Sequence, residues 1–271
     1  MRIVVGLTFV ALSAAAVVAS AQAGPPPDSR HIASSMRNRP MMRGFRMANG
    51  PELSAAINAL LQDEGAHMSM LPKRPLAAGD SARAASIVER ARAALSKYKD
   101  VRIAERDGYR KFMPWLENQA IYHYNNIGNA MAVVGAFDAT RPISLLYKKD
   151  ATGAMTLVGA MYSALPSSTP QDLDARLPTS IAHWHEHVNF CSASPDSVRA
   201  GVVKADAATA AHWLKITTRA DCAVARGRFV PQLFGWMAHV YLFASNDPAV
   251  IWGADHGSMD VHMDVHQPAG R

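Results

Sequence analysis

One stretch, residues 180–191, restricts the fold more than any other part of the chain. It reads Ser-Ile-Ala-His-Trp-His-Glu-His-Val-Asn-Phe-Cys, with histidines at the alternate positions His183, His185 and His187. Successive side chains of a β-strand point to opposite faces. The stretch therefore predicts a strand with one imidazole-rich face and one mostly apolar face. Neutral imidazole is the commonest side-chain metal ligand, so this strand is the predicted floor of a metal site.

The predicted ligands come from three separate parts of the sequence. Two histidines at i and i+2 on a strand point the same way and can share one ion, each at about 2 Å. His185 and His187 are such a pair, His239 lies in a second alternating apolar run, and His123 is the candidate fourth ligand. The side chains expected to support these ligands are His183, Asn189, Tyr122 and Tyr124. The residue types suit a single ion of Zn, Cu or Fe. The alternative is that the histidines are buried for packing and satisfied by hydrogen bonds.

Several common motifs are absent from the sequence. His185-Glu186 begins like the metalloprotease helix motif His-Glu-x-x-His, but the position of the second histidine is Asn189, which excludes that motif. Glu186 is expected on the face opposite to the histidines. No Gly-x-Gly-x-x-Gly loop, phosphate-binding loop or Gly-x-Ser-x-Gly elbow occurs. The sequence thus gives no support for a nucleotide cofactor.

The first 50 residues predict export followed by a linker. Residues 1–23 combine Arg2, an apolar core over 3–18 and a small-x-small cleavage pattern, which is typical of a signal peptide. A retained membrane anchor is the alternative, although the apolar core is short for a spanning helix. Residues 24–50 begin with three prolines and carry five arginines, which indicates a basic flexible linker with weak affinity for an anionic surface. A periplasmic or secreted protein is expected, and nucleic acid is not an expected partner.

Cys191 and Cys222 are the only two cysteines. In an oxidising compartment an even pair favours a disulfide. The alternative is that Cys191, on the histidine face, is a soft metal ligand.

Residues 51–252 are expected to form one α+β domain, with helices in 51–112 and mainly β structure in 113–252. A helix is predicted from Asp80-Ser81, because apolar residues follow at helical spacing up to residue 98. Apolar runs at 143–147 and 155–162, joined by a glycine-containing turn, predict a β-hairpin, and 227–243 predicts another strand. Helices followed by strands favour helices packed on an antiparallel sheet or sandwich. The tail, 253–271, carries histidines and methionines and is expected to be flexible.

Two resemblances accompany these patterns. The pair His185-x-His187, followed later by His239, resembles the metal-binding pattern of cupins, which implies a jelly roll. The usual glutamate after the pair and the Pro-x-Gly motif before His239 are absent. A second set of segments is similar to a group of exported bacterial proteins of unknown function: Tyr98-Lys99-Asp100-Val101, Ala104-Glu105, Gly108-Tyr109, Tyr122-His123-Tyr124, Leu145-Leu146-Tyr147 and Leu157-Val158-Gly159.

Three functions remain open from the sequence. A mononuclear histidine site with an open position favours a metal-dependent hydrolase or oxygenase. A non-catalytic periplasmic metal carrier, with copper bound by methionines and the tail, is the second hypothesis. A structural or adhesion module with buried histidines is the third.

Overall fold

The computed structural model describes residues 66–114, 116, 118–130, 133–193, 212–213 and 215–253. The predicted signal peptide, the basic linker, residues 51–65 of the predicted helical part and the tail after Gly253 lie outside these ranges. Within the described residues, no helix is both long enough and apolar enough to cross a membrane.

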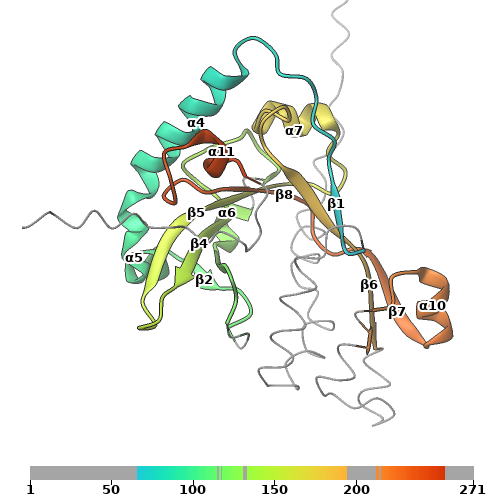
Figure 1. Ribbon diagram of the computed structural model, residues 1–271. Helices are drawn as coiled ribbons and strands as arrows, with labels where there is room; N and C mark the ends of the chain where they lie inside the picture. Colours follow the sequence, from blue (N-terminus) through green and yellow to red (C-terminus); the bar gives the residue numbers. More distant parts are fainter. Residues whose placement is uncertain are drawn as a thin grey trace, which may run out of the picture.

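The described residues form an α+β fold built on an antiparallel sheet of eight strands (Figure 1). Its strands are β1 (Met68–Met70), β2 (Arg110–Lys111), β3 (Tyr122–Asn125), β4 (Ser144–Lys149), β5 (Met155–Ala164), β6 (Trp184–Ala193), β7 (Gly227–Gln232) and β8 (Trp236–Val240). The strand order is β1-β6-β8-β5-β4-β3-β2, and β7 pairs with β6. The α+β class and the antiparallel pairing are confirmed. The described sheet is not closed, and the jelly roll stays a prediction from resemblance.

Six helices and one 3₁₀ turn accompany the sheet in the described ranges. They are α4 (Asp80–Leu95), η1 (Ser96–Lys99), α5 (Val101–Arg106), α6 (Ile127–Ala130), α7 (Pro170–Arg176), α10 (Arg219–Val224) and α11 (Pro248–Ile251). The predicted helix from Asp80 is α4, and its apolar positions Ala84, Ile87, Val88, Ala91 and Leu95 are buried. These positions recur every three or four residues, so they form one stripe that packs against the sheet. The prediction of helices packed on an antiparallel sheet is therefore confirmed.

The two faces of the sheet differ in composition. The face under α4 carries aromatic side chains, including Tyr122, Tyr124, Tyr147, Tyr162 and Trp184, in one core with the helix stripe. Buried phenols there donate to backbone carbonyls: Tyr147 to Tyr98 at 2.7 Å, Tyr162 to Ala139 at 2.7 Å and Tyr109 to Pro142 at 3.2 Å. The other face has a separate cluster that includes Leu146, Val158, Met161, Met237 and Tyr241. Alternation along the strands thus places the predicted histidines on the face away from α4.

The predicted hairpin is β4–β5. Leu146 lies opposite Gly159 and Tyr147 opposite Leu157, so one extra residue is inserted in β5 between these pairs. Such a bulge bends a sheet and increases its local twist.

The predicted strand at 227–243 is two strands, and that expectation was wrong. Leu233, Phe234 and Gly235 interrupt it, and β7 and β8 pair with different halves of β6. The amide of Leu233 donates to the carbonyl of His187 at 2.9 Å. The apolar run is continuous in the sequence. Its spacing therefore does not show that the chain forms two strands, each paired with a different section of one long strand.

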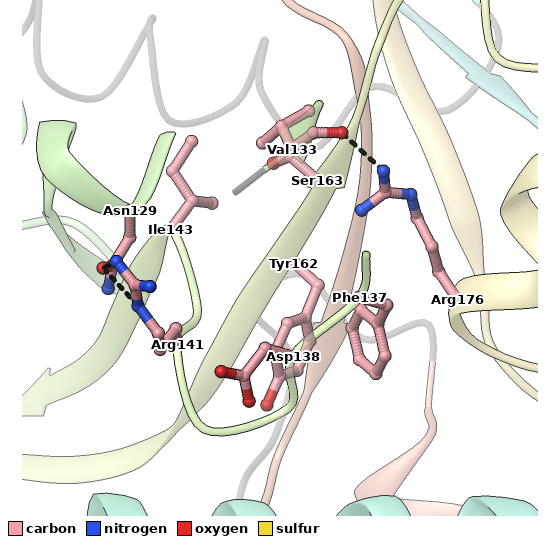
Figure 2. A pocket seen from close by; sticks show the side chains of 9 residues that line it. All are labelled: Asn129, Val133, Phe137, Asp138, Arg141, Ile143, Tyr162, Ser163 and Arg176. Carbon is pink, nitrogen blue, oxygen red and sulfur yellow. Dashed lines mark hydrogen bonds between the residues drawn. The ribbon is translucent and has the colours of Figure 1, made fainter. Parts of the chain in front are cut away.

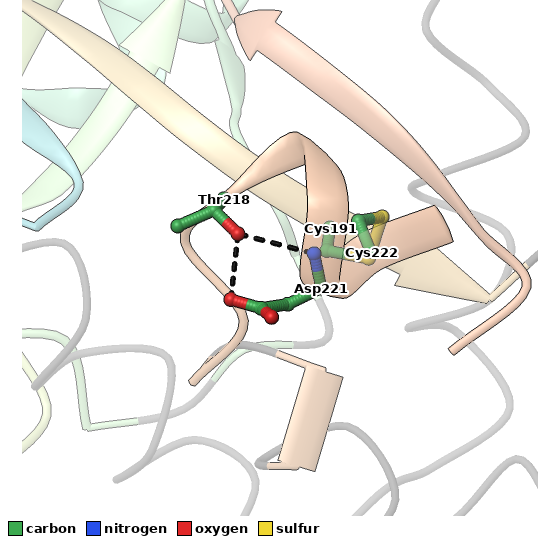
Figure 3. Close-up of a disulfide and its surroundings, with 4 residues drawn as sticks. All are labelled: Cys191, Thr218, Asp221 and Cys222. Atoms are coloured by element: carbon green, nitrogen blue, oxygen red, sulfur yellow. Dashed lines mark hydrogen bonds between the residues drawn. A yellow bond between two sulfur atoms is a disulfide. The ribbon is translucent and has the colours of Figure 1, made fainter. Parts of the chain in front are cut away.

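A disulfide joins β6 to α10 (Figure 3). Cys191 and Cys222 have Cα atoms 5.7 Å apart, and both side chains are buried with Trp213. Thr218 caps α10 by accepting a hydrogen bond from the amide of Asp221 at 3.1 Å. The predicted disulfide is confirmed, so Cys191 is not available as a metal ligand.

A helix was missed in the Pro- and Ser-rich connection that leads to the histidine strand. The helix α7 begins with Pro170 after a capping box formed by Thr169 and Asp172. Proline at the first helical position and an acid three residues after threonine are both helix-start signals. These two signals could have predicted the helix from the sequence.

A buried ion pair fixes the start of α4. Asp80 is 6 % exposed and accepts hydrogen bonds from Arg74 Nη1 and Nη2 at 2.6 and 2.8 Å, and from Ser180 Oγ at 2.7 Å. Arg74 Nε also donates to Asp174 at 2.8 Å. Ser180 immediately precedes the histidine strand region, so the network connects α4 to the segment that enters β6.

We expect Asp80→Asn to lower the melting temperature by about 5 °C at pH 7, because it removes the charge that pairs with Arg74. The hydrogen bonds from Arg74 and the amide of Ala77 hold the pKa of Asp80 below its usual range. Stability from this carboxylate is therefore complete above an unfolded pKa of about 4 and is lost as the pH falls below it. Thermal unfolding between pH 7 and pH 2 measures the effect.

The control for this prediction is Asp100→Asn, which removes the exposed pair with Arg102. Such pairs contribute little, so the control should unfold close to the wild-type temperature. For Asp80→Asn, the difference from wild type should narrow below about pH 4. A difference that stayed constant down to pH 2 would contradict the assignment.

Candidate metal centre

Four of the predicted histidines occupy one face of the sheet. His123 is on β3, His239 on β8, and His185 and His187 are on β6. His185 is 1 % exposed, whereas the other three are half-buried. Their side chains share the face away from α4, because strand residues next to them, such as Tyr122, Trp184 and Ala238, belong to the core under the helix.

One close approach joins histidines from distant strands. His123 Nε2 and His239 Nε2 are 3.2 Å apart. The strands β4 and β5 lie between β3 and β8 in the sheet order. Three strand spacings in a flat sheet amount to about 14 Å, which is further than two imidazole side chains together reach. The sheet must therefore curve around this face, and the bulge in β4–β5 supplies a bend at that place.

A glycine on the intervening strand β5 allows the close approach of the chain that leaves β8. His123 lies opposite Leu146, and Leu146 lies opposite Gly159. A Cβ added at Gly159 would be 2.3 Å from the carbonyl oxygen of Val240, so only glycine fits where the chain leaving β8 crosses β5. The absence of a side chain at Gly159 is thus part of how the sheet brings β8 toward β3.

The four rings continue as a row along the sheet. Ring centroids are 5.3 Å apart for His123 and His239, 5.2 Å for His239 and His185, and 5.6 Å for His185 and His187. The four histidines are therefore neighbours in a row on one face, while their convergence on a single ion stays a prediction. Within the described residues, however, no group of three or more His, Cys, Asp or Glu side chains is already arranged as a metal-binding set.

The residues expected to support the ligands behave differently from one another. Tyr122 and Tyr124 are buried in the core on the α4 face, so their predicted role beside His123 was wrong. The reason is strand alternation, which turns both neighbours of His123 to the opposite side. Asn189 has a left-handed backbone with φ of 61°, and its side-chain amide donates a hydrogen bond to the carbonyl of Ala66 at 3.4 Å. His183 precedes β6, and continuing the β6–β8 register by one residue sets it opposite His239.

Glu186 is half-buried and accepts a hydrogen bond from the side chain of Gln232 on β7. Burial raises its pKa above the usual range. Its cross-strand neighbour on β1 is Ser69.

The sequence analysis missed the methionines that flank the histidines. Direct cross-strand partners have Cβ atoms about 5 Å apart on the same face. Four such partners of the histidines are methionines: Met68 for His187, Met70 and Met237 for His185, and Met161 for His239. The alternation in Met68-x-Met70 and Met237-x-His239 was visible in the sequence, but their pairing with the histidine strand was not.

His67 is a further buried histidine that the sequence analysis did not select. Its Nδ1 lies 3.2 Å from the carbonyl oxygen of Val188, and its ring centroid is 4.8 Å from that of Phe190. These contacts describe a histidine packed against β6.

A separate small pocket lies beside the same sheet (Figure 2). None of the histidines lines it, although Val133 and Ile143 belong both to the pocket and to the apolar cluster on the histidine face. Both arginines that line the pocket donate hydrogen bonds to other residues of the protein. Arg141 donates to Asn129 at 3.3 Å, and Arg176 donates to the carbonyl oxygens of Val133 and Gly135. The histidine row is therefore the stronger candidate site.

Comparison with family models, curated proteins and solved structures finds no match to this chain.

Proposed function

We propose that this chain is a metal-binding protein in which His123 and His239 hold one transition-metal ion and His185 supplies a third imidazole. The observation that supports this proposal is the 3.2 Å between the Nε2 atoms of His123 and His239. Two imidazole nitrogens at 2.0–2.1 Å from a tetrahedral ion are about 3.3 Å apart. His185 is the next donor, with its ring centroid 5.2 Å from that of His239.

The position of the pair adds to this argument. His123 and His239 come from strands separated by two others, and the bulge and Gly159 together make their approach possible. The same 3.2 Å separation fits a hydrogen bond between two neutral imidazoles in complementary tautomers, and metal analysis distinguishes the two arrangements. His187 continues the row beyond His185 and is half-buried, so it provides a further donor beside the site.

Metal carriage is favoured over metal-assisted hydrolysis or oxygen chemistry. The side chains around the histidines on this face include Leu146, Val158 and the thioethers of Met161 and Met237. Such groups shield and ligate an ion, whereas hydrolysis requires proton transfer by a positioned acid or base. The disulfide is compatible with an oxidising compartment, which agrees with the proposed export to the periplasm or the exterior.

The experiment is metal analysis of the full chain, purified without a histidine tag and loaded with Zn²⁺, Co²⁺ or copper. We expect one firmly bound ion that is lost in the double variant His123→Ala/His239→Ala. The control is His212→Ala, because His212 is exposed and its ring lies beside that of Trp213, away from the histidine row. The tail histidines are present in all three proteins, so they contribute the same background.

Circular dichroism must show that the double variant is folded. Equal metal content in wild type and the folded double variant would overturn the proposal. Cobalt spectra provide a second measurement on the wild type, because tetrahedral coordination by nitrogen gives intense visible bands.

A further inference from the structure

Each histidine of β6 and β8 in the row has a methionine as its direct cross-strand partner. His185 lies between Met70 of β1 and Met237 of β8, while Met68 lies opposite His187. On the other side of β8, Met161 lies opposite His239. Thioethers from three different strands therefore share the face on which the imidazoles meet.

These methionines lie close to the candidate centre. Met161 is 7 % exposed and Met237 is 6 % exposed, and both belong to the apolar cluster on that face. Met237 is also two residues before His239 on β8, so the two side chains project from the same side of one strand. Cβ atoms of direct cross-strand partners lie about 5 Å apart, a separation at which two long side chains can ligate one ion.

We propose that the ion bound here is copper in the cuprous state, with the thioether sulfurs of Met161 and Met237 as ligands in addition to the imidazoles. Thioether sulfur is a soft donor that selects Cu(I), while imidazole accepts both copper and zinc. The burial of both methionines favours a singly charged ion over a doubly charged one, because desolvation opposes the higher charge. This inference rests on the proposed metal site and specifies its ion.

The proposed ligands differ from the methionines that the second hypothesis from the sequence assigned to copper. Those in the linker and the tail lie outside the described residues. Met161 and Met237 are instead fixed by strand register beside His239 and His185. Selection of copper would then be a property of the folded sheet.

The test is an anaerobic Cu(I) titration of the full chain against bathocuproine disulfonate, with ascorbate present to keep the copper reduced. The variant is Met161→Leu/Met237→Leu, because leucine nearly preserves the volume of methionine and removes only the thioether. The control is Met155→Leu, which lies on the same strand as Met161 but packs against the core under α4. Zn²⁺ affinity is measured in parallel.

We expect the double variant to lose at least about tenfold in Cu(I) affinity, because even groups that only support a ligand change metal affinity by about 10–100-fold. Its Zn²⁺ affinity should stay within about threefold of wild type, since thioether is a poor donor to zinc. The control should match wild type for both ions. X-ray absorption of the copper-loaded proteins should show sulfur scattering in wild type and a weaker sulfur signal in the double variant.

The outcomes separate this inference from the proposed function. Unchanged Cu(I) affinity in Met161→Leu/Met237→Leu, with loss in His123→Ala/His239→Ala, would overturn the thioether ligands and leave the histidine site standing. Equal loss of Cu(I) and Zn²⁺ affinity in the methionine variant would also overturn them, because it would indicate a packing role. Wild-type affinity in the histidine variant would overturn both proposals.

Discussion

Gly159→Ala is expected to destabilise the protein by about 3 kcal/mol, the upper end of the usual cost of overpacking. The added Cβ would lie 2.3 Å from the carbonyl oxygen of Val240 and 2.9 Å from the Cα of Tyr241. Both atoms belong to the main chain, so no side-chain rotation relieves the overlap. The chain leaving β8 must move away from β5, and the hydrogen bond from the amide of Phe243 to the carbonyl of Val158 at 3.0 Å lies beside that contact.

Urea unfolding followed by tryptophan fluorescence measures this effect, and Gly128→Ala is the matched control. Gly128 is exposed in α6, and the nearest atom to its added Cβ is a side-chain oxygen of Asn126 at 3.1 Å. That oxygen, which also accepts a hydrogen bond from the amide of Asn129, needs to shift by only a few tenths of an ångström. Alanine favours a helix over glycine by about 1 kcal/mol, so the control should change stability little. A loss below about 1 kcal/mol for Gly159→Ala would contradict the close crossing of β5 and β8. The same variant should also lose metal affinity, because moving β8 moves His239.

The double variant Cys191→Ala/Cys222→Ala is expected to lose roughly 3–4 kcal/mol of unfolding free energy. The disulfide spans 31 residues, and its removal releases that loop in the unfolded chain. Both sulfurs are buried against Trp213, and a Cβ added at Gly227 would lie 2.6 Å from the sulfur of Cys191. Loss of the bond therefore also loosens the packing of α10 against β6 and β7.

Chemical unfolding with and without a reducing agent measures the effect of the disulfide. Reductant should lower the stability of wild type and leave the double variant unchanged, so each protein is a control for the other. The folded double variant should keep wild-type metal affinity, since Cys191 is bonded to Cys222. Equal stability of the two proteins under oxidising conditions would contradict the prediction.

Local patterns predicted those parts of the fold whose evidence lies in adjacent residues. The spacing of apolar and histidine residues along short stretches predicts the apolar stripe of α4, the β4–β5 hairpin and the histidine strand β6. The division of residues 227–243 into β7 and β8 was not predictable in this way, because it depends on how a long partner strand is shared. The short strand β1 was missed for the same reason, since three residues of strand have no period of their own.

The candidate site shows the same limit. Alternation identified His185 and His187 as neighbours on one face, and a strand pattern singled out His239. His123 was selected from its polar, aromatic surroundings in the sequence. Strand order, however, sets which histidines meet, and it brings a nitrogen of His123 to 3.2 Å from one of His239. The tyrosines beside His123 were selected for their proximity in sequence, which on a strand places them on the wrong face.

The bulge beside Leu146 links the curvature of the main chain to the distance between the imidazoles. His123 lies opposite Leu146, so its separation from His239 follows the curvature of the β4–β5 hairpin at that residue. The opposite side of the hairpin is backed by α4 and a layer of buried tyrosines, and packed interiors resist deformation. If the proposed ion binds between these rings, an ion of unsuitable radius would strain the backed hairpin as well as the rings. Discrimination by size would then depend on the curvature of the backbone.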